Sequence, residues 1–140
     1  MRIICYTDGG ARGNPGPAGA GVFITDVAGK TLKEVSKFLG HQTNNYAEYE
    51  AVIIALEEAK KIISKEKRKT AEIEVRMDSE LVERQLSGKY QIKEPTLFPK
   101  FIKIWNMRVS EFPNVSFTHV RREQNKDADR LANEAMDRGH

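Results

Sequence analysis

Residues 2–10 read Arg2-Ile3-Ile4-Cys5-Tyr6-Thr7-Asp8-Gly9-Gly10, a short apolar run that ends in a carboxylate followed by glycines. Residues 2–7 are rich in isoleucine, tyrosine and threonine, which favour a β-strand. A segment dense in glycine and proline follows from Gly9 to Gly21, and it is expected to be loop or turn. An acid at the end of a buried strand needs either water or a partner. Asp8 is therefore the first candidate for a functional residue.

Four more strands and four helices are predicted beyond this stretch. Alternating or β-branched residues indicate strands at 22–25, 31–39, 73–77 and 115–120. Helical spacing and good helix formers indicate helices at 44–63, 79–86, 96–109 and 127–137. The order β-β-β-α-β-α-α-β-α predicts an α/β fold, with a mixed sheet and helices on its faces.

Two helices carry further local signals. Thr43 or Asn44 is a suitable N-cap for the helix at 44–63. The helix at 96–109 has an apolar stripe, which we expect to pack in the core together with its tryptophan: Phe98, Phe101, Ile102 and Trp105.

Length and composition restrict the class of protein. The 140 residues suit one domain, placed at 1–140, and the hydrophobic fraction of 39% with 31% charged residues is typical of a globular chain. A net charge of +3 permits a polyanionic partner without requiring one. The single cysteine, Cys5, excludes a disulfide framework and a zinc site built from cysteines, and it favours a reducing, cytoplasmic setting. No apolar run approaches the ~18 residues of a membrane span, and Asp8 comes too early for a signal peptide.

Four acids occupy similar places in the predicted elements. Asp8 and Asp78 each end a strand, whereas Glu48 and Asp129 lie near the starts of helices. Strand ends and helix starts can converge on one edge of an α/β sheet, where ligands bind. Taken alone, each acid is more typical of a helix cap or a solvated charge, and only the joint pattern points to a shared site. Together they would repel one another, and divalent Mg²⁺ or Mn²⁺ would remove that conflict, with two ions serving in-line attack on a phosphodiester.

At these residues the sequence resembles type 1 ribonuclease H. Four motifs occur in the order and with the spacing of that family, and they span nearly the whole chain: Tyr6-Thr7-Asp8-Gly9-Gly10-Ala11-Arg12-Gly13-Asn14-Pro15-Gly16, Thr43-Asn44-Asn45-Tyr46-Ala47-Glu48, Met77-Asp78-Ser79 and Asn125-Lys126-Asp127-Ala128-Asp129-Arg130-Leu131-Ala132-Asn133. One such motif would be weak, whereas four in order form a strong signal.

The resemblance implies a ribonuclease H-like fold with a five-stranded mixed sheet and helices on both sides. It also implies endonucleolytic hydrolysis of the RNA strand of an RNA–DNA hybrid, with water as nucleophile, by a monomer without an obligate protein partner. By the match of motifs, the catalytic and metal-binding carboxylates would be Asp8, Glu48, Asp78 and Asp129. Asp127 competes with Asp129, but the two are about 200° apart on a helix, so they cannot both face one site.

The family match also implies a set of substrate contacts. The strand choice has to come from the ribose 2′-hydroxyl, which DNA lacks. The residues carried over for contacts to the hybrid are Gly9, Gly10, Arg12, Asn14, Thr43, Asn44, Asn45 and Arg121. Simpler interpretations stay open, because glycines mark ordinary turns and because Thr43 or Asn44 can serve as a helix cap.

The sequence departs from the family in three places. The loop Arg121-Arg122-Glu123-Gln124-Asn125 lacks the histidine that many bacterial members have there, so an arginine, Arg121 or Arg122, is expected to take a related role. Glu80 stands where a glutamine often contacts RNA. The segment from Gly88 to Phe98 is too short for the basic protrusion of some members, so we expect weaker and more salt-sensitive binding.

Two other functions remain in competition. The same fold could bind hybrid or structured RNA without cutting it, although a pure binder has no reason to keep four repelling acids. It could also belong to a resolvase-like or transposase-like DNA nuclease, although Asn44, Asn45 and the glycine-rich segment suit a ribose contact better.

Overall fold

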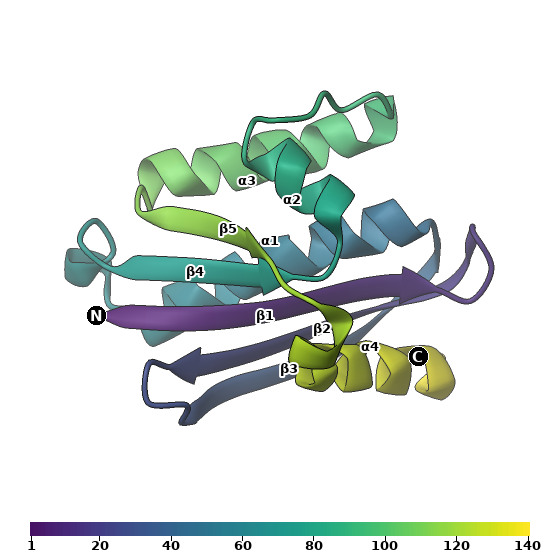
Figure 1. Ribbon diagram of the computed structural model, residues 1–140, viewed down its shortest axis with the longest axis horizontal. Coiled ribbons are helices and arrows are strands. Elements are labelled where there is room, and N and C mark those ends of the chain that lie inside the picture. Colours follow the sequence, from purple (N-terminus) through teal and green to yellow (C-terminus); the bar gives the residue numbers. More distant parts are fainter.

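The computed structural model describes residues 1–140 and contains one five-stranded sheet with the strand order β3-β2-β1-β4-β5 (Figure 1). The strands are β1 (Arg2–Ala11), β2 (Gly16–Asp26), β3 (Thr31–Gln42), β4 (Glu72–Met77) and β5 (Val115–His119). β1, β2 and β3 form an antiparallel meander, whereas β4 runs parallel to β1 and β5 parallel to β4. The sheet is therefore mixed, as the order of elements predicts.

Four α-helices surround this sheet: α1 (Asn44–Ile62), α2 (Glu80–Leu86), α3 (Phe98–Ser110) and α4 (Lys126–Arg138). In Figure 1, α1 lies behind the sheet and α4 in front of it, while α3 packs beside α1. Thr43 is the N-cap of α1, because its side-chain oxygen accepts a hydrogen bond from the Tyr46 N–H at 3.2 Å. Such a cap stabilises a helix by about 1 kcal/mol.

The main core lies between the sheet and α1. Ile3 and Cys5 of β1 and Val75 of β4 are fully buried there with Leu56 of α1. Cys5 acts as a small apolar residue, and burial raises the pKa of its thiol to about 12. The thiol therefore stays protonated and unreactive.

The segment Gly9–Gly21 is not the loop that its glycines and prolines predict. β1 continues to Ala11 and β2 begins at Gly16, so that only residues 12–15 form the turn. Asp8 consequently lies within β1 rather than at its end. The prediction of the loop was wrong because it took the glycines as turn residues.

Close packing of helices on both faces of the sheet explains these glycines. A Cβ atom on Gly9 would lie 2.2 Å from the carbonyl carbon of Ala47 in α1. A Cβ atom on Gly21 would lie 2.1 Å from the carbonyl oxygen of Ala128 in α4. Glycine is thus required where the backbone of a helix touches a strand.

Three of the four residues in the apolar stripe of α3 are exposed, contrary to the prediction, whereas Phe101 packs against the core as expected. Phe98, Ile102 and Trp105 are 45%, 55% and 53% exposed, respectively. The buried residues of α3 are Ile104 and Met107 instead. α3 lies at the margin of the molecule, where no further layer covers its outer side (Figure 1). The expectation that Trp105 packs in the core is therefore wrong.

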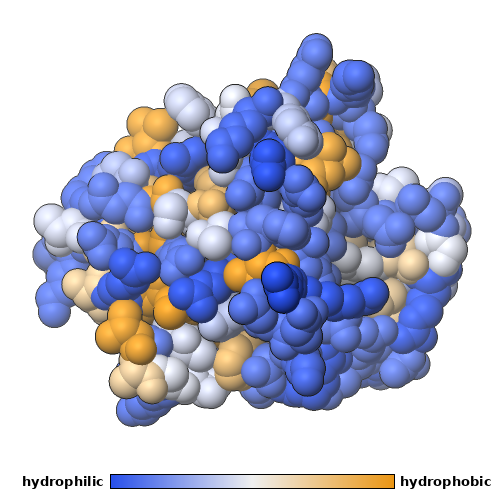
Figure 2. Space-filling view, in the orientation of Figure 1, coloured by the Kyte–Doolittle hydropathy of each residue, from blue (hydrophilic) through white to orange (hydrophobic).

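The surface seen in Figure 2 is mostly hydrophilic, with separate hydrophobic patches. Charged side chains pair across elements, as Lys103 of α3 does with Glu57 of α1 at 3.0 Å. None of the helices combines the length and the apolarity that crossing a bilayer would demand.

Candidate metal centre

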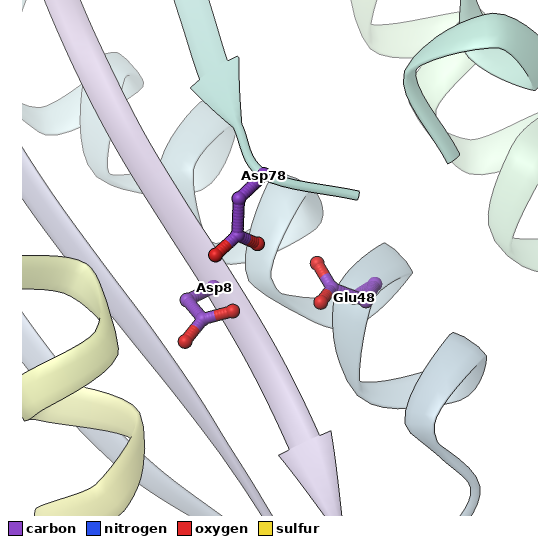
Figure 3. A group of neighbouring side chains, drawn as sticks. All are labelled: Asp8, Glu48 and Asp78. Carbon is purple, nitrogen blue, oxygen red and sulfur yellow. The ribbon is translucent and has the colours of Figure 1, made fainter. Parts of the chain in front are cut away.

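Three carboxylates from three different elements meet at one point (Figure 3). Asp8 lies on β1, Glu48 in the second turn of α1, and Asp78 directly after β4. One oxygen from each carboxylate lies within 4.8 Å of the other two. Figure 3 shows the three side chains turned toward one another. We call Asp8, Glu48 and Asp78 the acidic cluster.

The end of β4 makes this approach possible. The last pair between β1 and β4 joins Thr7 to Met77. Asp8 therefore lies one residue beyond the part of β1 that pairs with β4. Because side chains alternate along a strand, Asp8 points to the face opposite that of Gly9, which faces α1. Glu48 of α1 therefore reaches Asp8 past the end of β4 instead of across the sheet.

Burial and mutual repulsion raise the pKa values of the acidic cluster. Burial, and then the charges of Asp78 and Asp129, raise the pKa of Asp8 to about 8. The pKa of Glu48 lies well above its usual value, chiefly because the side chain is buried and then because of the charges on Asp8 and Asp78. Burial also raises the pKa of Asp78. Without a cation, the cluster would hold protons at neutral pH.

The donor atoms of the acidic cluster fit a hard divalent cation. The Oε2 atom of Glu48 is buried and has no hydrogen-bond partner in the protein. A buried anionic oxygen without a partner is costly, and a cation would remove that cost. The three side chains offer carboxylate oxygens, which are the ligands that Mg²⁺ and Mn²⁺ prefer.

Asp129 lies in the first turn of α4, beside Asp8 but outside the acidic cluster. It raises the pKa of Asp8 through its charge and a side-chain hydrogen bond. The Nη2 atom of Arg122 lies 3.8 Å from the Oδ1 atom of Asp129, so part of that charge is compensated. Asp127, by contrast, is more exposed and pairs with Arg130 at 3.5 Å.

An open cleft of about 490 Å³ contains the acidic cluster. Of the residues that the sequence predicts as substrate contacts, five line this cleft: Gly9, Gly10, Arg12, Asn44 and Arg121. The other three, Asn14, Thr43 and Asn45, lie outside its lining.

His119 and Asn133 also line the cleft, although the sequence assigned neither of them a role. His119 pairs in register with Met77 across β4 and β5, which brings it next to Asp78. Burial raises the pKa of Asp78, and the charges of Arg122 and then of His119 offset part of that rise. His119 could have been predicted to lie near Asp78 from the pairing of the ends of β4 and β5. That pairing follows only once the strand order is known.

Arg12 is engaged with α4 instead of being free in the cleft. Its Nη1 atom donates to Asp137 Oδ1 at 2.7 Å, and its Nη2 atom donates to Asn133 Oδ1 at 3.0 Å. Gly10 is less constrained than Gly9, since an added Cβ would only meet the Cε atom of Met136 at 3.6 Å.

The asparagines at the start of α1 are held by hydrogen bonds to neighbouring segments. The Oδ1 atom of Asn44 accepts from the Ala11 N–H at 2.8 Å. The Asn44 N–H donates to Asn14 Oδ1 at 3.0 Å. The Nδ2 atom of Asn45 donates to Glu94 Oε1 at 2.9 Å. These bonds fix the first turn of α1 against the end of β1 and against the segment before α3.

The loop before α4 is tied to the strand that carries Asp8. The Arg121 N–H donates to Gln124 Oε1 at 3.0 Å. The Nδ2 atom of Asn125 donates to the Thr7 carbonyl at 2.9 Å in a buried position. Arg121 and Arg122 thereby stand at the rim of the cleft on a fixed loop.

Comparisons with known proteins agree with this fold. Residues 6–135 match the family described as reverse transcriptase-like. The chain is 39% identical over 138 residues to the bifunctional protein Rv2228c of Mycobacterium tuberculosis, covering 98% of this chain and 36% of that protein. It is 41% identical over 136 residues to ribonuclease HI of Halobacterium salinarum, covering 97% of this chain and 65% of that protein. The chain thus spans only part of the length of these relatives.

A solved structure matches nearly end to end. LC11-RNase H1, isolated from compost by a metagenomic approach, superposes with a TM-score of 0.92 at 55% identity, covering 98% of this chain and 96% of that one. A second structure of LC11-RNase H1, in complex with an RNA/DNA hybrid, gives a TM-score of 0.90 at 53% identity, with 97% of each chain covered. Since family match, strand order and whole-chain identity agree, this chain belongs to the type 1 ribonuclease H family.

Proposed function

We propose that this chain is a metal-dependent endoribonuclease that hydrolyses the RNA strand of RNA–DNA hybrids and leaves 5′-phosphate and 3′-hydroxyl ends. The observation that carries the proposal is the acidic cluster, whose carboxylate oxygens lie within 4.8 Å of one another in an open cleft. The relative in Halobacterium is named ribonuclease HI, and LC11-RNase H1 has been solved with an RNA/DNA hybrid. Both relatives support the choice of substrate.

The four acids are proposed to hold divalent cations, Mg²⁺ or Mn²⁺, with two ions per site. The acidic cluster would supply the shared ligands, and Asp129 would complete the set from α4. Such ions, when bound, activate the attacking water and stabilise the leaving 3′ oxygen of a phosphodiester. The chain itself fixes the oxygen donors on a central strand and a buried helix turn, so that no ligand has to be ordered on binding.

The proposed substrate contacts act through different groups. Gly9 and Gly10 present backbone at the floor of the cleft, and Arg121 presents a cation at its rim. The Arg12 guanidinium is paired with Asp137, which compensates part of the charge that it could offer to a phosphate. The Thr43 hydroxyl oxygen is used by the helix cap, so its hydroxyl proton is the group left for a phosphate oxygen. Asn14, Asn44 and Asn45 would contact the minor groove.

We further propose that residues 1–140 are sufficient as a catalytic domain and that the chain works in the cytoplasm as a monomer without an obligate protein partner. The short connection between α2 and α3 supports weaker binding of the hybrid than in relatives with a basic protrusion. The absence of a loop histidine is proposed to be compensated in part by Arg121 or Arg122.

Strand-specific cleavage tests the proposal directly. Each strand of a hybrid is labelled in turn and incubated with Mg²⁺ or Mn²⁺. We expect fragments from the RNA strand alone, and we expect Asp8→Asn to abolish them while the circular dichroism spectrum is retained. Cleavage of the DNA strand alone, or of neither strand with either ion, contradicts the proposal.

Two outcomes of the same assay would favour the competing functions. Tight hybrid binding without turnover, independent of divalent ions, indicates a binding module. Cleavage of an all-DNA junction indicates a resolvase-like nuclease.

A further inference from the structure

Asn45 makes a single side-chain hydrogen bond, and that bond determines which way its amide is turned. Its partner is the carboxylate of Glu94, 2.9 Å away. A carboxylate only accepts, so the Asn45 group that faces it has to be the NH₂ donor. The amide oxygen of Asn45 is therefore the end left free for a ligand.

The two neighbouring asparagines are turned the opposite way by the same logic. A backbone N–H only donates, so the atom of Asn44 that faces the Ala11 N–H is its oxygen Oδ1. The atom of Asn14 that faces the Asn44 N–H is likewise its oxygen. Asn44 and Asn14 therefore have free NH₂ donors, whereas Asn45 has a free acceptor.

The position of Asn45 places this acceptor on the path of a long ligand. Asn44 lines the cleft of the acidic cluster, and Glu94 lines a second depression of about 520 Å³. Lys89, Tyr90 and Lys93 also line this second depression, so it offers cations and an aromatic ring. A nucleic acid that extends from the cleft into the depression has to pass Asn45.

The segment that carries Glu94 is anchored to α2 and through it to α1. This segment follows α2. The Nε2 atom of Gln85 in α2 donates a hydrogen bond to the Gln91 carbonyl at 3.4 Å, three residues before Glu94. The Oε1 atom of Gln85 in turn accepts from the Tyr49 hydroxyl of α1 at 2.7 Å in a buried position. The connection before α3 is thereby tied to the same helix that carries Asn45.

We propose that Glu94 is a positioning residue that fixes the carbonyl end of Asn45 toward the substrate, so that Asn45 reads a hydrogen-bond donor in the minor groove of the hybrid. This inference rests on the proposed function. Two groups of that chemistry occur there, the ribose 2′-hydroxyl of the RNA strand and the exocyclic amine of guanine. The NH₂ donors of Asn44 and Asn14 would bind hydrogen-bond acceptors of the hybrid. The three amides together therefore offer two donors and one acceptor in fixed positions.

Reversing the hydrogen-bond chemistry at residue 94 tests the proposal. Lysine only donates, so Glu94→Lys should turn the Asn45 amide over. The substrates are a hybrid and two series of single replacements along it, 2′-deoxy for ribose and inosine for guanosine. The readout is the ratio of KM values for replaced and parent hybrids within each variant, which cancels the effect of added charge.

For the wild-type chain, we expect a replacement at one position of one series to raise KM about fivefold, with kcat little changed. This penalty corresponds to the loss of a single hydrogen bond. Glu94→Lys and Asn45→Ala should reduce this penalty to less than about twofold. Glu66→Lys, an equal change of charge at an exposed site beyond the far end of α1, is the matched control and should keep the penalty. A penalty in Glu94→Lys equal to that of the wild-type chain overturns the proposal, as does the absence of a penalty in both series.

A measurement without substrate separates this proposal from the nuclease itself. In ¹⁵N-labelled protein, the Nδ2–H₂ resonances of Asn45, identified by their loss in Asn45→Ala, should move upfield in Glu94→Ala because the carboxylate acceptor is gone. Unchanged resonances overturn the positioning role. A wild-type chain that cleaves no hybrid contradicts the proposed function instead, and the amide resonances then decide the positioning role alone.

Discussion

At the scale of single residues, the carboxyl groups of the acidic cluster work against the stability of the metal-free fold. Asp8 and Glu48 are both buried, which raises the pKa of each, and the charge of Asp8 raises the pKa of Glu48 further. Their protons are therefore held more tightly in the folded chain than in the unfolded one. Divalent cations would relieve the same repulsion that the protons relieve.

The stability of the metal-free protein should consequently fall as pH rises. Because the folded pKa of Asp8 is about 8, its protonated form contributes stability fully below the unfolded value of about 4, and this is lost as pH rises toward 8. The slope can reach about 1.4 kcal/mol per pH unit for each proton involved. Urea unfolding in EDTA between pH 5 and pH 8 measures it, and a stability that is flat or rises with pH would contradict the assignment. Added Mg²⁺ should reduce the decline.

Asp8→Asn should stabilise the metal-free chain while abolishing cleavage. The amide cannot ionise, so repulsion with Glu48 and Asp78 disappears, and we expect a gain of about 1–3 kcal/mol at pH 8. Paired urea unfolding curves and cleavage assays measure both effects. Asp127→Asn, at the exposed neighbour that pairs with Arg130, is the control and should change neither.

At the scale of elements, the sequence predicts the types and order of the strands and helices, but not where the helices touch the sheet. Period and propensity are local, so the helix at 44–63 and the strand at 73–77 are close to α1 and β4. The role of Gly9 depends on a contact with Ala47, almost forty residues away along the chain, which no local pattern reports. Because Gly9 and Gly21 lie within strands that contact helices, the turn is confined to residues 12–15.

Gly9→Ala should unfold or strongly destabilise the chain. The added Cβ would lie 2.2 Å from the backbone of α1, which cannot be relieved by a rotamer change. We expect a loss of about 3 kcal/mol or more in the free energy of unfolding. Gly10→Ala is the matched control, because its Cβ would make only an ordinary contact with Met136. Equal losses in the two variants would show that the close approach of α1 is not the cause.

The two faces of α3 should respond differently to truncation. Ile104→Ala removes a buried side chain and should cost about 2–5 kcal/mol, whereas Ile102→Ala, at a residue 55% exposed, should cost less than about 1 kcal/mol. Denaturant titration compares them. Trp105 is the single tryptophan, so the native fluorescence should also be accessible to iodide quenching. A large loss in Ile102→Ala together with a shielded tryptophan would place the stripe in the core after all.

At the scale of the whole molecule, the site depends on pairings that the sequence cannot reveal. The resemblance to a family placed Asp8, Glu48 and Asp78 together, and the structure brings these three within 4.8 Å. His119 becomes part of the same cleft only because β5 runs parallel beside β4. Glu94 lies on a connection with no motif, and its contact with Asn45 follows from the packing of that connection against α1.

Hybrid binding should depend on salt through a small number of phosphate contacts. The net charge is only +3, and the cations that line the cleft and the second depression are Arg121, Arg122, Lys89 and Lys93, besides Arg12, which is paired with Asp137. With about four contacts, log K should fall with log[salt] at a slope near −3 to −4. Fluorescence anisotropy between 50 and 200 mM KCl, roughly the range in which such slopes are measured, determines it.

Lys93→Ala should lower that slope by about 1 without changing which sequences are bound, because a phosphate contact carries no base information. Lys65→Ala, at an exposed residue of the turn after α1, is the control and should leave the slope unchanged. A slope that is identical in Lys93→Ala would remove the second depression from the binding surface.

The early end of β4 has a consequence for how this fold can vary. Side chains from the two faces of the sheet can meet beside Asp8, because the neighbouring strand β4 stops at Met77. An insertion that prolonged β4 by two paired residues would make the sheet continuous beside Asp8. Glu48 and Asp129 would then lie on opposite faces of that sheet. A shared cation site in this architecture therefore depends on the length of the pairing between β1 and β4 as well as on the presence of the acids.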